Sequence, residues 1–202
     1  MRETSSSPRD RIIDAAFAAF MQFGYEGTST SDIARLARVS KRDLYVYFPS
    51  KRAMLESCIA ERAQSMRAPL SLPVPDSPEE LRETLVRFGT TFLCELSQPE
   101  VLATHRLAIV NAEIAPDVAQ TLDRFGRASM VEGLMGLLEP VRERGLLIGA
   151  DTHEMAEIFF AILMRGLLIR MVMRVAEPPT EAEAHARAKL AADSLWRLYG
   201  RS

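Results

Sequence analysis

Cysteine and histidine are scarce in this chain of 202 residues, and their scarcity excludes several kinds of site. The two cysteines, Cys58 and Cys94, lie far apart, form no CxxC pair and have no histidine cluster nearby. Such spacing favours neither a zinc site nor a disulfide framework, so we expect buried structural thiols, no metal and no cofactor. The three histidines have no catalytic partner nearby, and no GxSxG, Walker or dinucleotide-binding motif appears. We therefore do not expect an enzyme.

Long hydrophobic runs without charge are also missing, although one segment comes close. Residues 154–175 (EMAEIFFAILMRGLLIRMVMRV) are long enough to cross a bilayer, but Arg165 and Arg170 interrupt the middle. Each charge near a bilayer centre costs about 2.5–3.5 kcal/mol on insertion scales. The first ten residues contain no apolar core that could serve as a secretion signal. The sequence predicts a cytoplasmic protein with no membrane partner, in which residues 154–175 form one buried helix.

Apolar side chains recur at helical spacing almost throughout, and no stretch alternates with period two. We therefore expect an all-α protein. Hydroxyl, acidic and proline residues predict where the helices begin. The expected starts are at or near Ser7, Ser29, Ser40, Ser50, Ser77, Pro99, Ala115, Asp151 and Thr180. The run that starts at Ala115 extends to Gly145, and Pro140 should kink it unless it lies near an internal break.

A proline-rich segment divides the chain. Residues 68–81 (APLSLPVPDSPEEL) contain four prolines and cannot form a helix interior. We therefore predict an N-terminal domain of residues 1–66, which includes a connecting helix, and a larger C-terminal helical domain of residues 67–202.

Basic and aromatic residues are interleaved in one short segment, VSKRDLYVYFPSK, at residues 39–51. Residues 29–52 contain six basic and two acidic side chains, a net charge of +4, so the rest of the chain carries −6 of the total of −2. Two short helices are predicted here with a tight turn between them, and Leu44 and Phe48 point inward. This pattern is typical of a helix-turn-helix, whose second helix enters the major groove of DNA.

The longer segment GYEGTSTSDIARLARVSKRDLYVYFPSKRAML, residues 24–55, resembles the DNA-binding domain of the tetracycline-repressor (TetR) family of bacterial transcriptional regulators. The resemblance covers roughly residues 9–66. It implies a three-helix DNA-binding domain followed by a helical domain for ligand binding and dimerisation. It also implies a repressor that binds a pseudo-palindromic operator as a homodimer and is released by a small, largely apolar effector.

The resemblance implies DNA contacts at eight positions. Thr30 and Ser31 open the first of the two short helices, and Lys51 is expected to pair with a phosphate. The predicted DNA-binding residues are Thr30, Ser31, Lys41, Arg42, Asp43, Tyr45, Tyr47 and Lys51. Two residues depart from the family pattern: Arg38 replaces the usual glycine of the turn, and Asp43 replaces a small residue. Asp43 either reads a cytosine amino group or repels phosphate while it holds Arg42 by a local ion pair.

The C-terminal region matches the family in its helical architecture, and two further sets of residues are predicted there. The last two helices should form the dimer interface, with Ile162, Gly166, Ile169, Met173, Ala188, Leu195 and Trp196 as candidates. The ligand pocket candidates are Phe88, Phe92, His105, Arg106, Phe125, Met130 and Phe160, which equally fit a plain hydrophobic core. An alternative function is that of a stand-alone helical ligand-binding protein. Salt-dependent binding to duplex DNA would distinguish the two.

Overall fold

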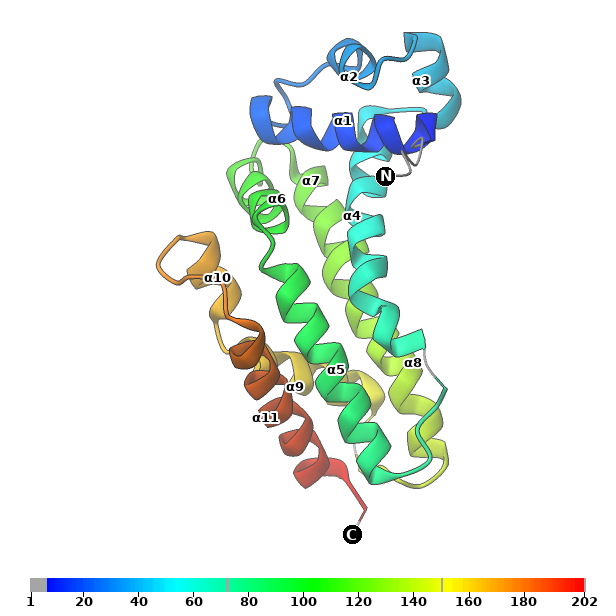
Figure 1. Ribbon diagram of the computed structural model, residues 1–202, viewed down its shortest axis with the longest axis vertical. Helices are drawn as coiled ribbons and strands as arrows, with labels where there is room; N and C mark the ends of the chain where they lie inside the picture. The colour runs from blue at the N-terminus through cyan, green and yellow to red at the C-terminus, as the bar shows by residue number, and fades with distance from the viewer. Residues whose placement is uncertain (1–6, 72, 150, 202) are drawn as a thin grey trace, which may run out of the picture. The chain divides into compact units, whose positions relative to one another are not determined.

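The computed structural model describes residues 7–71, 73–149 and 151–201, and the first six residues, used above to exclude a secretion signal, lie outside that part. The regular elements of the described residues are helices, apart from an isolated antiparallel β-bridge between Leu147 and Gly200 (Figure 1). The all-α prediction is therefore confirmed. No helix in these ranges combines the length and the apolar character that a membrane span requires.

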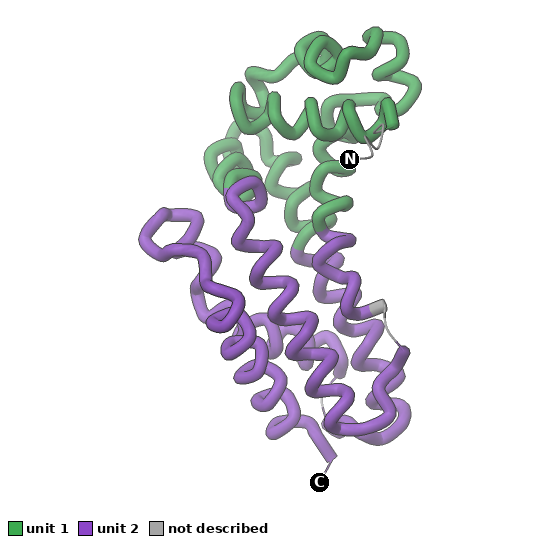
Figure 2. The backbone as a smooth tube through the Cα atoms, viewed as in Figure 1, with its two compact units in different colours: residues 1–62, 103–126 green, residues 63–102, 127–202 purple. Residues whose placement is uncertain are grey.

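The elements follow one another as α1 (Pro8–Phe23), α2 (Thr30–Ala37), α3 (Lys41–Tyr47), α4 (Lys51–Arg67), the 3₁₀ turn η1 (Ala68–Ser71), α5 (Pro78–Leu96), α6 (Pro99–Val110), α7 (Pro116–Leu122), the π-helical segment η2 (Asp123–Ala128), α8 (Ser129–Glu143), α9 (Thr152–Met164), α10 (Leu167–Val172) and α11 (Glu181–Tyr199). They divide into two compact units (Figure 2). Unit 1 comprises the described residues of 1–62 and 103–126, and unit 2 those of 63–102 and 127–202. Residues 103–126 thus join the N-terminal helices, although the proline-based boundary assigned them to the C-terminal domain.

Unit 1 is built on a core that α1, α2, α3 and α4 share. Its fully buried side chains include Ile12, Phe20, Ile33, Leu44 and Met54. The segment of residues 103–126 adds further buried residues to the same cluster, namely Ala108, Ala115 and Val118. Helices α2 and α3 therefore pack on a core to which residues 103–126 also contribute.

In unit 2, helices α5 and α11 pack closely against each other. A Cβ atom added at Gly89 of α5 would lie 2.8 Å from the Cβ of Ala188 on α11, so only glycine fits there. Ala184, Ala191 and Ala192 are also fully buried on α11. Small residues on both helices let the backbones pack tightly, and α9 covers the next side of α11.

The apolar segment of residues 154–175 is not one helix, and this prediction was wrong. Helix α9 ends at Arg165, which adopts the left-handed conformation (φ 41°, ψ 46°), and Gly166 is left-handed as well. The guanidinium Nη1 of Arg187, on α11, lies 3.4 Å from the carbonyl oxygens of both Leu163 and Met164. It donates to carbonyls that the end of α9 leaves without helical partners, and its charge suits the negative end of the helix dipole. The break is therefore stabilised by a residue distant in sequence.

The run that starts near Ala115 is also interrupted. Between α7 and α8, residues 123–128 form the π-helical segment η2, and Pro140 lies inside α8. After α8, Arg144 holds the proline-rich linker: its Nη1 donates to the carbonyl oxygens of Val74 and Pro75, both at 3.3 Å, and pairs with the carboxylate of Asp76.

Candidate DNA-binding interface

Helices α2 and α3 each begin directly after a serine that the sequence predicted as the cap. The hydroxyl oxygen of Ser29 accepts from the amide of Asp32 at 3.1 Å, and that of Ser40 accepts from the amide of Asp43 at 3.0 Å. Between the helices, Arg38 adopts the left-handed conformation (φ 55°, ψ 46°) that glycine would take more easily. The turn therefore has the geometry expected of a helix-turn-helix, although a side chain replaces the usual glycine.

The structure brings four of the predicted DNA-binding residues together on unit 1. The hydroxyl oxygens of Thr30 and Tyr45 lie 3.2 Å apart, and the Lys41 Nζ donates to the Ser31 Oγ at 3.3 Å. These two contacts align the start of α2 with one face of α3. Leu44, fully buried, anchors α3 from behind. The arrangement presents hydroxyl, ammonium and phenol groups on one continuous surface.

The remaining predicted residues of α3 are also exposed. Arg42 and Asp43 lie in its first turn, and Tyr47, which is 43% exposed, lies in its last turn. None of the three is needed to fill the core. They remain predicted DNA contacts.

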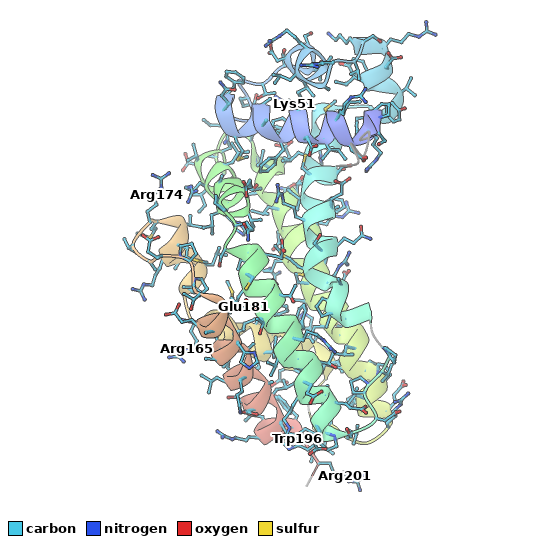
Figure 3. All side chains as sticks on the ribbon, viewed as in Figure 1. Lys51, Arg165, Arg174, Glu181, Trp196 and Arg201 are labelled. Atoms are coloured by element: carbon cyan, nitrogen blue, oxygen red, sulfur yellow. The ribbon has the colours of Figure 1, made fainter. Side chains whose placement is uncertain are left out.

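Lys51 lies at the start of α4 (Figure 3), and its side chain contacts a residue that the sequence did not link to it. Its Nζ donates to the backbone oxygen of Tyr25 at 2.7 Å and lies 4.3 Å from the centroid of the Tyr25 ring. Burial, and then the nearby carboxylate of Asp117, raise the pKa of Tyr25 to about 12, so the phenol stays neutral at physiological pH. An ammonium group has three donors, and the one directed at Tyr25 leaves two for a phosphate.

Asp43 has a role that neither sequence hypothesis included. The Ser40 hydroxyl donates to its Oδ2 at 2.6 Å, while the amide of Asp43 donates back to the Ser40 Oγ at 3.0 Å. Ser29 and Asp32 make the same pair of bonds at the start of α2, at 2.5 Å and 3.1 Å. The carboxylate of Asp43 therefore supports the first turn of the helix on which it lies.

Substitution of Asp43 should separate this capping role from base reading. We expect Asp43→Asn, which keeps an acceptor for Ser40, to leave the unfolding free energy and the base preferences nearly unchanged. Asp43→Ala should lower the unfolding free energy slightly, because it removes the carboxylate that accepts from Ser40 and a negative charge from the first turn of α3, and Asp32→Ala should have the same effect at α2. Urea unfolding and duplex selection measure the two effects. Relaxed preference at one symmetric C·G pair in both Asp43 variants would instead identify a base reader.

The residues predicted for a ligand pocket are divided between the two units. Phe88, Phe92 and Phe160 belong to unit 2 and form an aromatic cluster with Phe159, in which ring centroids lie 5.2–6.1 Å apart. Met130 is buried in the same core. The other three candidates lie in unit 1. His105 and Arg106 are on α6, and Phe125 is partly buried and packs against the core of unit 1. The aromatic cluster is thus the part of the predicted pocket that the fold assembles within one unit.

Unit 2 also has an open groove of about 630 Å³ between α5 and α11. Charged side chains dominate its walls, among them Arg82, Glu83 and Arg87 of α5 and His185 and Lys189 of α11. None of the predicted pocket residues lines it. In the described part of the chain, no cluster of three or more His, Cys, Asp or Glu side chains is placed to hold a metal ion.

The residues predicted for the dimer interface fall into two groups. Ala188 and Leu195 are completely buried within unit 2, where they stabilise the fold of a single chain. Ile169 and Met173 are 51% and 64% exposed. The remaining candidates are the exposed Gly166 and the partly buried Ile162 and Trp196.

Two exposed leucines of α11, Leu190 and Leu198, were not predicted for this interface. Arg165 and Arg174 border α10 at its two ends (Figure 3). The exposed apolar surface of α10 and α11 thus differs in part from the predicted set.

The surface of α2 and α3 defines the class of protein. Two short helices meet at a tight turn, the second is anchored by Leu44, and its exposed side carries hydrogen-bond donors next to the start of the first. This is the architecture of a helix-turn-helix DNA-binding protein.

Comparison with known proteins identifies the family. Residues 12–58 match the family of bacterial regulatory proteins described as the tetR family, and residues 83–201 match the C-terminal domain of AefR-like transcriptional repressors. The chain belongs to the TetR family of bacterial transcriptional regulators, with a C-terminal domain of the AefR-like type. It is a DNA-binding transcriptional regulator.

Individual relatives agree with this assignment. A TetR transcriptional regulator from Agrobacterium tumefaciens is 28% identical with a TM-score of 0.78, over 98% of this chain and 97% of that one. The flavonoid-responsive regulator FrrA is 27% identical with a TM-score of 0.76, over 96% of this chain and 97% of FrrA. The uncharacterised HTH-type transcriptional regulator YvkB of Bacillus subtilis (strain 168) is 24% identical over 173 residues, which cover 85% of this chain and 88% of YvkB.

Proposed function

We propose that this regulator is a cytoplasmic repressor that binds a pseudo-palindromic operator as a homodimer and is released by a small, largely apolar ligand. The observation that carries the proposal is the pair of contacts between α2 and α3, Thr30 with Tyr45 and Lys41 with Ser31. These contacts hold hydrogen-bonding groups from two helices on one surface before DNA arrives. A preorganised surface loses less conformational entropy on binding.

Homodimer formation supplies the second reading helix. A pseudo-palindromic operator presents two equivalent half-sites about 34–36 Å apart, so two copies of α3 must be held at a fixed spacing. We assign the interface to the exposed apolar residues of α10 and α11, namely Ile169, Met173, Leu190 and Leu198. The same patch then contacts itself across a two-fold axis.

The aromatic cluster of unit 2 supports the proposal that the ligand is apolar. Phe92 and Phe160 are less deeply buried than Phe88 and Phe159, so the cluster has an inner and an outer side. Aromatic faces favour flat, apolar molecules, and the similar regulator FrrA is described as flavonoid-responsive. Such a ligand releases DNA only if it binds the non-DNA-binding conformation more tightly.

DNA binding through Lys51 provides the test of this function. A duplex is first selected from a random pool by the purified protein, and its Kd is then measured at several salt concentrations. Lys51→Gln should weaken binding to the selected duplex and to an unrelated duplex by similar factors. It should also flatten the slope of log K against log[salt] by about 0.9 for each Lys51, hence by roughly two for a dimer. Each phosphate contact that forms on binding releases about 0.9 counterion, and this release is lost with the contact.

Lys189→Gln is the matched control, since Lys189 lies on α11 and pairs with Asp193 at 2.6 Å. Its slope should equal that of the wild-type protein. An unchanged slope for Lys51→Gln would exclude Lys51 from the interface. Failure of the wild-type protein to bind any duplex in a salt-dependent way would support a stand-alone ligand-binding protein instead.

A further inference from the structure

Val46 is the one apolar residue of α3 whose position neither the core nor helix formation explains. It is 74% exposed, whereas its apolar neighbour Leu44 is fully buried. A β-branched residue also lowers helix propensity slightly. Among the large apolar residues of α3, no other is as exposed as Val46.

The geometry of α3 places Val46 on the outward side of the helix. Successive residues of an α-helix are rotated by about 100°, so Val46 points roughly 200° away from Leu44, nearly opposite the buried side. Arg42, four residues earlier, shares this outward side. The adjoining side carries Lys41 and Tyr45, which contact Ser31 and Thr30 of α2. Val46 therefore borders the surface through which the helix meets DNA.

The major groove offers one apolar group that such a side chain could contact. Base edges there present hydrogen-bond donors and acceptors, and the phosphates are charged, but thymine carries a 5-methyl group that apolar side chains contact. A valine among phosphates would gain nothing, whereas against a thymine methyl it removes apolar surface from water.

We propose that Val46 contacts the 5-methyl group of a thymine and is a specificity-determining residue that favours an A·T pair at one symmetric operator position. The inference rests on the proposed binding of an operator through α3. It adds an apolar element to a surface whose other assigned residues are polar or aromatic. The cognate half-site should contain a thymine whose methyl group, rather than its hydrogen-bonding edge, is recognised.

Replacing thymine by uracil tests this contact, because the exchange removes the methyl group and leaves base pairing intact. In the duplex selected from a random pool, thymines at symmetric positions are replaced by uracil one pair at a time. Kd is measured for the wild-type protein and for Val46→Ala. At one symmetric position the wild-type protein should lose about fourfold in affinity per methyl, as expected for one buried methyl group, hence roughly 15-fold for both half-sites.

At that position Val46→Ala should already bind the thymine duplex more weakly by a similar factor and should lose nothing further with uracil. At every other thymine the two proteins should respond alike. Val110→Ala is the matched control, since Val110 at the end of α6 is 77% exposed. It should reproduce every wild-type value.

Two results would overturn the proposal: equal losses for wild type and Val46→Ala at every thymine, or a selected operator without thymine at any symmetric position. Either would leave the proposed function standing, because the operator would still be bound. Absence of binding to any duplex would defeat the proposed function and this inference together. Circular dichroism of Val46→Ala should match the wild-type spectrum, because the change is exposed and alanine favours helix.

Discussion

Ile169→Glu is expected to convert the dimer into a monomer and to lower affinity for the selected operator by roughly 100-fold or more. Ile169 is 51% exposed on α10, within the surface assigned to the homodimer. A two-fold interface doubles any substitution, so two carboxylates would be buried without a partner, and one such charge costs about 3–5 kcal/mol. Sedimentation and operator titration measure the two effects.

Ile148 provides a matched control for this prediction. It is also an exposed isoleucine, with 52% of its surface accessible, but it lies between α8 and α9. Ile148→Glu should remain dimeric and bind the operator with wild-type affinity. A dimer that persists in Ile169→Glu, or an Ile148→Glu that dissociates instead, would place the interface elsewhere on the chain.

Phe88→Ala should destabilise the protein more than any other single aromatic truncation in the cluster. Phe88 is fully buried, and its ring centroid lies 5.9 Å from those of Phe159 and Phe160 and 6.1 Å from that of Phe92. Truncation removes these contacts and leaves a cavity, at a cost of about 3–5 kcal/mol in unfolding free energy. Urea unfolding measures the loss.

Phe23→Ala is the control, since Phe23 at the end of α1 is 48% exposed and should contribute less than about 1 kcal/mol. Small aromatic compounds should bind the Phe88→Ala protein and raise its midpoint of unfolding, because an apolar cavity accepts them. A loss below about 1 kcal/mol for Phe88→Ala would show that the cluster has no stabilising role.

Helix starts were predictable because their signals are local. Ser29, Ser40, Asp151 and Thr180 each accept a backbone hydrogen bond within the next three residues, as the sequence pattern required. The resemblance between residues 24–55 and the TetR family correctly predicted the fold and the class of function. The helix-start signals and the family resemblance both depend on residues that lie close together in the chain.

Features that depend on distant residues were not predicted. The apolar pattern of the sequence continues through the break at Arg165. The residue that stabilises the break, Arg187, lies 22 positions further along the chain. Tyr25 could not be linked to Lys51 from spacing alone, because 26 positions separate them. Val46 was different, since its angle from Leu44 was readable in the sequence. The resemblance to the TetR family did not include it among the implied DNA contacts, which are polar or aromatic residues.

The path of the chain between the two units limits how this protein can be recombined with others. The chain passes from one unit to the other three times, after residues 62, 102 and 126. A chimera that joins residues 1–66 to a foreign ligand-binding domain would lack Ala108, Ala115 and Val118, which complete the core beneath the DNA-binding helices. Exchange of operator specificity between relatives is therefore better made by grafting the exposed residues of α2 and α3 than by exchanging whole N-terminal segments.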